Sequence, residues 1–167
     1  GVDAGPDTGV VADAYVPMDA GDSCGCTAGP HGDRIYVLSD EAELYSYDPV
    51  ADAFAFIALV DCGGAHMPYS MAVDTVGRGW VLFNDAHDIY TVDLNDPSGC
   101  GDPGYVHSNA TFDLFGMSFT ASPGGGCPRL FVHSYSGTGP FDEGPGIGAL
   151  GEIDYAGGPI TELVAID

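Results

Sequence analysis

The sequence lacks lysine and has very little positive charge of any kind. Its three basic residues are Arg34, Arg78 and Arg129, they stand against 25 acidic residues, and the formal net charge of the 167-residue chain is −22. Phosphate backbones and anionic lipid surfaces repel such a chain, which argues against nucleic-acid and membrane-surface binding. Without lysine there is no P-loop, no Schiff base and no Ser-Lys dyad.

Long apolar runs and helical periodicity are missing as well. No apolar stretch approaches the roughly 20 residues of a membrane-spanning helix, and no window follows a 3.6-residue period. Yet 45% of the residues are hydrophobic and 11% aromatic, which is too rich for a wholly disordered chain. Short aromatic and β-branched runs, separated by turn residues, predict an all-β protein. The predicted strands are 34–39, 43–48, 53–60, 70–74, 79–84, 88–94, 115–120, 129–134, 151–155 and 159–166.

The first 27 residues have a different composition from the rest. They consist mainly of Asp, Ala, Gly, Pro, Thr and Val, with one aromatic residue. Such a segment buries too little apolar area to offset the entropy of ordering it, so residues 1–27 are predicted to be a disordered acidic linker. A linker of this kind commonly tethers a secreted domain to a surface. Because the sequence begins at Gly1 with no signal peptide, we expect a processed or trimmed chain.

Residues 28–167 contain a repeat of about 45 residues. The segment 35–38 recurs as 80–83, the segment 45–48 recurs as 90–93, and 70–73 recurs 46 residues further on as 116–119. Each copy has four strand positions with short turns, which is typical of a β-propeller blade. The length accommodates about three blades, whereas closed propellers usually have about 4–8. We therefore expect part of a larger propeller, or one completed by a second copy.

The segment 70–94, SMAVDTVGRGWVLFNDAHDIYTVDL, resembles the NHL and SMP-30-like propeller repeats. The Asp-Ala-Gly-Pro tail at 3–7, the segment 68–74 and the segment 115–119 resemble a group of secreted propeller proteins of myxobacteria and related bacteria. The resemblance covers roughly residues 34–134, and the third copy departs from the repeat through an insertion at 135–148. It implies a propeller fold and, through the lactonase branch of the SMP-30-like fold, a metal-dependent hydrolase as an alternative function.

Histidine and acidic residues gather in the connections that should lie at one end of the blades. The connections after the second and fourth strands of each blade share an end, where propellers usually bind ligands. These residues are Asp40, Glu41, His66, Asp85, His87, Asp88 and His107, with His133 ending a strand nearby. A divalent metal such as Ca²⁺ or Zn²⁺ could bind His66, His87, His107, Asp85 and Asp88. The alternative is that these are solvated turn residues.

Other polar residues favour structural roles. Asp74, Asp93 and Asp154 end strands, where they are expected to cap tight turns; Ca²⁺ ligation is the alternative. No serine lies in a Gly-x-Ser-x-Gly elbow. A sugar-binding aromatic platform would most simply use a rim tyrosine such as Tyr69 or Tyr105.

Five cysteines indicate an oxidising compartment. Turn topology places Cys100 and Cys127 at one end of adjacent blades, so we expect these two to form a disulfide. Cys62 should then pair with Cys24 or Cys26. Such loops stabilise a fold by roughly 3–4 kcal/mol each.

The sequence thus favours a non-catalytic β-propeller module, secreted, periplasmic or on the outer cell surface. It is expected to bind a protein or glycan, with no cofactor and no membrane-spanning segment. Further blades or a second copy are possible partners. A metal-dependent lactonase-like hydrolase is the alternative.

Overall fold

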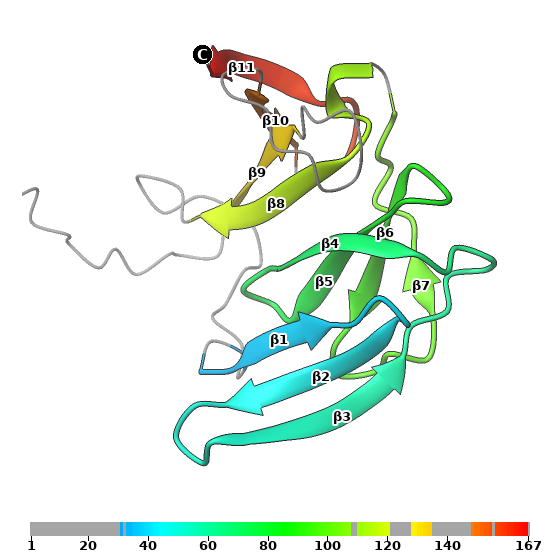
Figure 1. Cartoon of the computed structure of the whole chain (residues 1–167), viewed down its shortest axis with the longest axis vertical. Coiled ribbons are helices and arrows are strands. Elements are labelled where there is room, and N and C mark those ends of the chain that lie inside the picture. Colours follow the sequence, from blue (N-terminus) through cyan, green and yellow to red (C-terminus); the bar gives the residue numbers. More distant parts are fainter. Residues whose placement is uncertain are drawn as a thin grey trace, which may run out of the picture.

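The chain forms three antiparallel sheets that follow one another in sequence (Figure 1). The computed structural model describes residues 31, 33–107, 110–120, 128–134, 148–154 and 156–166. This part of the chain contains no α-helix, only the 3-10 turn η1 (Ala110–Phe112), and so no helix that could cross a membrane. The predicted all-β class is confirmed. The predicted linker 1–27 and three of the cysteines, Cys24, Cys26 and Cys127, lie outside the described residues, as does most of the insertion.

The sheets agree closely with the predicted strands. The first sheet has the order β1 (Ile35–Leu38), β2 (Glu43–Asp48), β3 (Ala53–Leu59). The second has the order β4 (Pro68–Val73), β5 (Arg78–Phe83), β6 (Asp88–Asp93), β7 (Cys100–Gly101). The third has the order β8 (Phe115–Thr120), β9 (Arg129–Ser134), β10 (Gly148–Ile153), β11 (Thr161–Ile166). Only the two-residue strand β7 was not predicted, because it is too short to give an apolar run.

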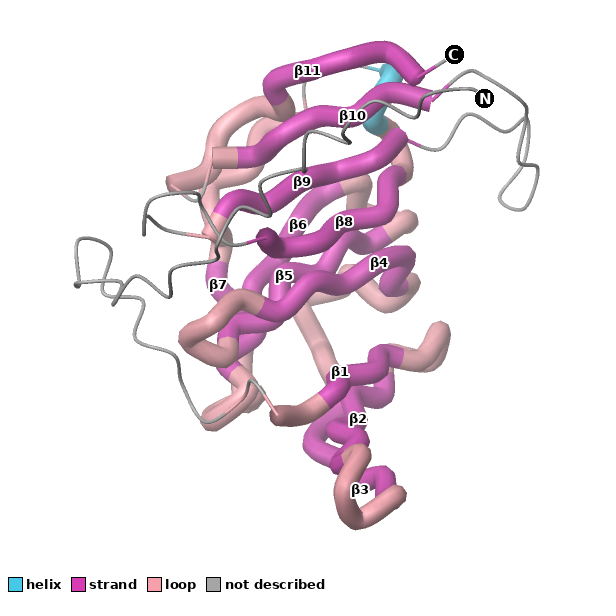
Figure 2. The backbone as a smooth tube through the Cα atoms, turned by 90° about the vertical axis from the view of Figure 1, so that its left-hand side faces the viewer, coloured by secondary structure: helices cyan, strands magenta, loops and turns pink. Residues whose placement is uncertain are grey.

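The second sheet is packed on both of its faces (Figure 2). Trp80 and Leu82 of β5 belong to the apolar core shared with the third sheet. Val81 and Phe83 of the same strand belong to the core shared with the first sheet. The alternation of side chains along a strand explains this division. A strand covered on both sides must be apolar throughout, as the sequence Trp80-Val81-Leu82-Phe83 is.

Strand pairing corrects the repeat by one residue. Tyr45 pairs with Val37, and its counterpart Tyr90 pairs with Val81, so β1 precedes β5 by 44 residues rather than 45. The predicted match of Ile35 with Trp80 is therefore wrong, and Tyr36 is the counterpart of Trp80. The cause lies at the turns: the pair Ser39–Glu43, beyond the end of β1, encloses three residues, whereas the pair Phe83–Asp88 encloses four. A one-residue shift exchanges the two faces of a strand.

The match between Met71 and Met117 is confirmed. Met71 of β4 pairs with Val81, and Met117 of β8 pairs with Val132. Met71 packs on the core between the first and second sheets, and Met117 on the core between the second and third. Each methionine thus lies in the first strand of its sheet and faces the preceding sheet.

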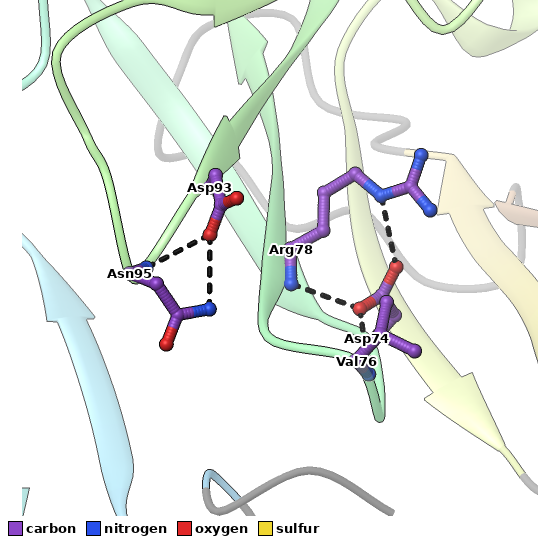
Figure 3. A network of polar contacts seen from close by, with 5 residues as sticks. All are labelled: Asp74, Val76, Arg78, Asp93 and Asn95. Atoms are coloured by element: carbon purple, nitrogen blue, oxygen red, sulfur yellow. Dashed lines mark hydrogen bonds and ion pairs between the residues drawn. The ribbon is translucent and has the colours of Figure 1, made fainter. Parts of the chain in front are cut away.

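The strand-ending aspartates cap turns, as predicted (Figure 3). Asp74 accepts hydrogen bonds from the backbone N–H groups of Val76 and Arg78, at 3.1 and 2.9 Å, and pairs with the Arg78 guanidinium at 3.3 Å. Asp93 accepts from the backbone and side-chain nitrogens of Asn95, at 2.8 and 3.1 Å. Asp154 accepts from the backbone N–H of Ala156 at 2.8 Å. These contacts satisfy turn donors and account for the aspartates without a bound cation.

The predicted disulfide between Cys100 and Cys127 is wrong, and so is the pairing of Cys62 with Cys24 or Cys26. Cys100 is bonded to Cys62, with a Cα–Cα distance of 5.3 Å. The prediction assigned the two residues to opposite ends of the sheets by the type of connection that carries them. In the structure, β3 ends close to β7, so the third residue after β3 reaches the first residue of β7 (Figure 1). The disulfide fastens the outer edge of the second sheet to the connection that leaves the first.

Candidate functional site

Two histidines meet at a carboxylate where the β5–β6 turn approaches the β7–β8 connection. Asp113 Oδ1 lies 3.0 Å from His87 Nδ1 and 3.4 Å from His107 Nε2. The two imidazole rings stack, with their centroids 5.9 Å apart and their planes 24° apart. All three side chains are partly exposed. We call His87, Asp113 and His107 the histidine cluster; it presents two imidazoles to solvent around one shared acid.

The backbone of the β5–β6 turn fixes the position of His87. His87 has a backbone φ of +50°, in the left-handed region that most residues other than glycine and asparagine rarely adopt. Its N–H donates to Phe83 O at 2.9 Å and closes the turn. Ala42, the last residue of the β1–β2 turn, has φ of +61°. An alanine adopts the same conformation at the corresponding place. The left-handed backbone is therefore required by the geometry of the turn and is not evidence for a chemical role of His87.

Asp85 joins the same end of the second sheet to the β3–β4 connection. Its carboxylate accepts hydrogen bonds from the backbone N–H groups of His66 and Met67, at 2.9 and 3.3 Å. These donors hold the pKa of Asp85 below its usual range, chiefly through the N–H of His66. Asp85 therefore holds the β3–β4 connection in place. It contacts the backbone of His66 rather than its imidazole.

A buried tyrosine underlies the cluster. Tyr105 lies in the β7–β8 connection and packs in the core between the second and third sheets. Burial, with a smaller contribution from the charges of Asp88 and Asp113, raises the pKa of Tyr105 to about 12. Asp88 accepts a hydrogen bond from the N–H of Ile89 at 2.8 Å. The phenol is therefore uncharged at neutral pH.

The predicted metal-binding residues divide into separate contacts. The structure brings His87 and His107 together, and Asp85 to the backbone of His66. Asp40 and Glu41 lie exposed in the β1–β2 turn of the first sheet, and His133 lies exposed near the end of β9. Among the described residues, no three His, Cys, Asp or Glu side chains are arranged to hold a metal ion. The metal site stays a prediction.

Sequence reasoning missed Asp113, the residue that joins the two histidines. It follows η1 in the same connection as His107. The topological rule that selected His107 applies equally to Asp113, so its position in that connection was the available signal.

A groove between the first and second sheets is a second candidate site. Its volume is about 280 Å³, and it is lined by Tyr36, Val37 and Leu38 of β1 and by residues 68–71 of β4. Burial is the main cause that raises the pKa values of Tyr36 and Tyr69. The Tyr36 hydroxyl lies 2.6 Å from His31 Nδ1.

The groove lies where a fourth strand of the first sheet would run. In the other two sheets, β4 lies beside β5 and β8 lies beside β9. β1 is the counterpart of β5, and the described residues place no strand on its free edge. The hydrogen bond from Ser39 N to Glu43 O fixes the alternation along β1, so the backbone N–H and C=O groups of Tyr36 and Leu38 point toward that edge.

Comparisons with protein-family models and with curated proteins each found no match.

Proposed function

We propose that the chain is a non-catalytic β-propeller module, secreted or held on the outside of the cell, that binds an extended segment of a partner protein. Strand addition along the free edge of β1 would supply the binding. The observation that carries the proposal is the groove beside β1, in the position that β4 and β8 occupy in the other sheets. Unpaired edge groups and alternating side-chain positions are what strand-adding proteins use for affinity and specificity.

The arrangement of the sheets supports the propeller. Three sheets of repeated sequence pack face to face in chain order, and the first strands of the second and third sheets face the preceding sheet through Met71 and Met117. Blades of a propeller pack in this way. The Cys62–Cys100 disulfide supports a location outside the reducing cytoplasm.

The hydrolase alternative would require three or four metal ligands at one centre with an acid or base beside them. The histidine cluster instead engages both imidazoles with one carboxylate. No contact of the described residues favours the hydrolase over the binding module. Metal-dependent hydrolysis of an aromatic lactone by the purified chain, lost in His87→Ala/His107→Ala, would revive it.

The test uses a fluorescent peptide with the sequence of residues 66–76, which contains β4. Because β4 occupies the equivalent position beside β5, this peptide should bind the chain beside β1, and a scrambled peptide should not. Tyr36→Pro and Tyr36→Val form a matched pair, since both remove the phenol but only proline removes the edge N–H. We expect at least about tenfold weaker binding by Tyr36→Pro than by Tyr36→Val, measured by fluorescence anisotropy.

Equal binding by the two variants would contradict strand addition. A glycan array provides the competing outcome. Glycan binding that is lost in Tyr69→Ala and retained in Tyr47→Ala, an aromatic change on the other face of the first sheet, would assign the groove to a sugar.

A further inference from the structure

The outer face of the first sheet is apolar and aromatic. Cross-strand pairs place Ile35 beside Tyr47 and Tyr47 beside Phe54 in one row. A second row runs from Val37 through Tyr45 to Phe56. The rings of Tyr47 and Phe54 are 4.8 Å apart, and those of Tyr45 and Phe56 are 5.5 Å apart. We call Ile35, Val37, Tyr45, Tyr47, Phe54 and Phe56 the first-sheet outer face.

This face is exposed to an unusual degree. Phe54 and Phe56 retain 65% and 58% of their accessible area, and Ile35 retains 55%. Single exposed apolar residues are ordinary on protein surfaces, but a contiguous patch of six marks an interaction surface. Figure 1 shows the first sheet at one end of the described part of the molecule, with the second sheet next to it.

The corresponding face is buried in the other two sheets. By the corrected register, Val37 and Tyr45 correspond to Val81 and Tyr90, which pack on the core facing the first sheet. In the third sheet, Met117 and Val132 occupy the same side and pack against the second sheet. A face that receives the preceding sheet in both other cases thus lies open in the first.

We infer that the first-sheet outer face binds a second copy of this chain, through the outer face of that copy's third sheet. The third-sheet outer face contains Ser118, Phe131, Leu150 and Glu152, which register places on one side of β8, β9 and β10. In the second sheet, the corresponding face is the one that carries Trp80 and packs against the third sheet. The contact continues the stacking already present between the first and second sheets and between the second and third.

Charge and packing favour this pair of faces. Arg129 lies over the ring of Phe131 at 4.8 Å, so the third-sheet outer face carries one of the three positive side chains of the chain. Acidic residues border the first-sheet outer face, where Glu43 and Asp52 accept hydrogen bonds from Tyr45 and Tyr47, each at 2.7 Å. Arg129 is paired with Glu152 on the same face, so this arrangement brings the acidic border of the first face against a charge-balanced face and avoids the repulsion of two acidic borders. Each copy carries both faces, so the contact is head-to-tail.

The experiment is sedimentation equilibrium on the full chain and on two surface variants. Phe54→Ser/Phe56→Ser alters the first face, and Ser118→Glu places a charge on the other face, at an exposed position of its edge strand β8. Because a head-to-tail pair leaves one face free at each end, we expect the unchanged chain to form dimers that two such contacts close, or longer assemblies, and each variant to dissociate at least about 100-fold more readily. Val50→Ser is the matched control, since Val50 is 96% exposed in the β2–β3 turn outside the face, and it should dimerise like the unchanged chain.

Mixing the two variants tests the head-to-tail arrangement. A mixture pairs the intact third-sheet face of one variant with the intact first-sheet face of the other, so dimers should return. Monomers in the mixture would overturn the arrangement, and a monomeric unchanged chain at its highest soluble concentration would overturn the inference itself. Circular dichroism checks that the variants are folded. Peptide binding uses the edge of β1 and dimerisation uses its face, so either proposal can fail without the other.

Discussion

The two junctions between neighbouring sheets differ in the side chains that fill them and in whether a disulfide links them. The second and third sheets share a core of large aromatic side chains, in which Trp80, Phe112 and Phe115 are fully buried and Trp80 meets Phe119 edge to face. The first and second sheets share mainly aliphatic side chains around Leu44 and Val81, together with the buried ring of Phe83, and a disulfide lies at the margin. Apolar packing thus holds both junctions, aromatic side chains dominate the one between the second and third sheets, and a disulfide adds a covalent link to the other.

This difference predicts unequal dependence on conditions. Apolar burial acts in any redox environment and scales with the area removed from water. A disulfide stabilises mainly by restricting the unfolded chain, and it is lost on reduction. The first sheet should therefore be the part of the described chain most sensitive to reductant, and the third sheet the part most sensitive to truncation of aromatic residues.

The largest effect is expected at the aromatic junction. Trp80→Ala removes a fully buried indole and leaves a cavity between the second and third sheets. We expect a loss of about 3–5 kcal/mol in the free energy of unfolding, measured by urea denaturation. Val50→Ala, at an exposed turn position, should change it by less than about 0.5 kcal/mol. A small effect of Trp80→Ala would mean that the junction is not a cooperative core.

Removal of the disulfide should weaken the other junction. Cys62→Ser/Cys100→Ser opens a loop whose ends are 38 residues apart, and we expect a loss of about 2–4 kcal/mol. Hydrogen exchange distinguishes the site of the loss, because amide protection should fall in β1–β3 before it falls in β8–β11. Equal loss in the first and third sheets would contradict the contrast between the junctions.

Alkaline pH offers a smaller and selective test of the aromatic junction. Tyr105 lies in that core, and burial raises its pKa from 10.0 to about 12. A raised pKa in the folded state contributes stability that is fully present below pH 10 and is lost as the pH rises through about 12. Partial solvent screening makes this contribution at most about 2–3 kcal/mol. Tyr105→Phe should therefore show a smaller fall in stability between pH 9 and pH 12 than the unchanged chain, which denaturant titrations at each pH would measure.

Local patterns predicted most of the fold, and contacts between distant segments account for the errors. Ten strands and the turn-capping roles of Asp74, Asp93 and Asp154 depend on side-chain alternation and on hydrogen bonds within a few residues. Asp113 and the Cys62–Cys100 bond depend on how one connection passes another sheet, which no short pattern encodes. The repeat was predicted correctly, but the match in β1 was shifted by one residue. Comparing apolar residues between the copies does not reveal that one turn has one residue fewer. That single residue decides which side chains of β1 lie on the exposed face of the first sheet.

The smallest effect is expected at the third-sheet outer face, where the polar pair Arg129–Glu152 replaces the apolar contacts of the two junctions. The Arg129 Nε donates to Glu152 Oε1 at 2.6 Å, and a second guanidinium nitrogen contacts the other carboxylate oxygen. The Arg129 guanidinium holds the pKa of Glu152 below its usual range. A lowered pKa in the folded state contributes stability that is present above the unfolded value and is lost as the pH falls through the folded value.

Glu152→Gln should therefore destabilise the chain at neutral pH and have no effect once the carboxyl is protonated in both states. Because both side chains are partly exposed, solvent screens the pair and the expected loss is at most about 1 kcal/mol. The difference between variant and unchanged chain should shrink below about pH 4 and also in concentrated salt. Denaturation at neutral and acidic pH, each with and without added salt, measures both dependences. A difference that persists in acid would show that Glu152 acts through packing rather than through its charge.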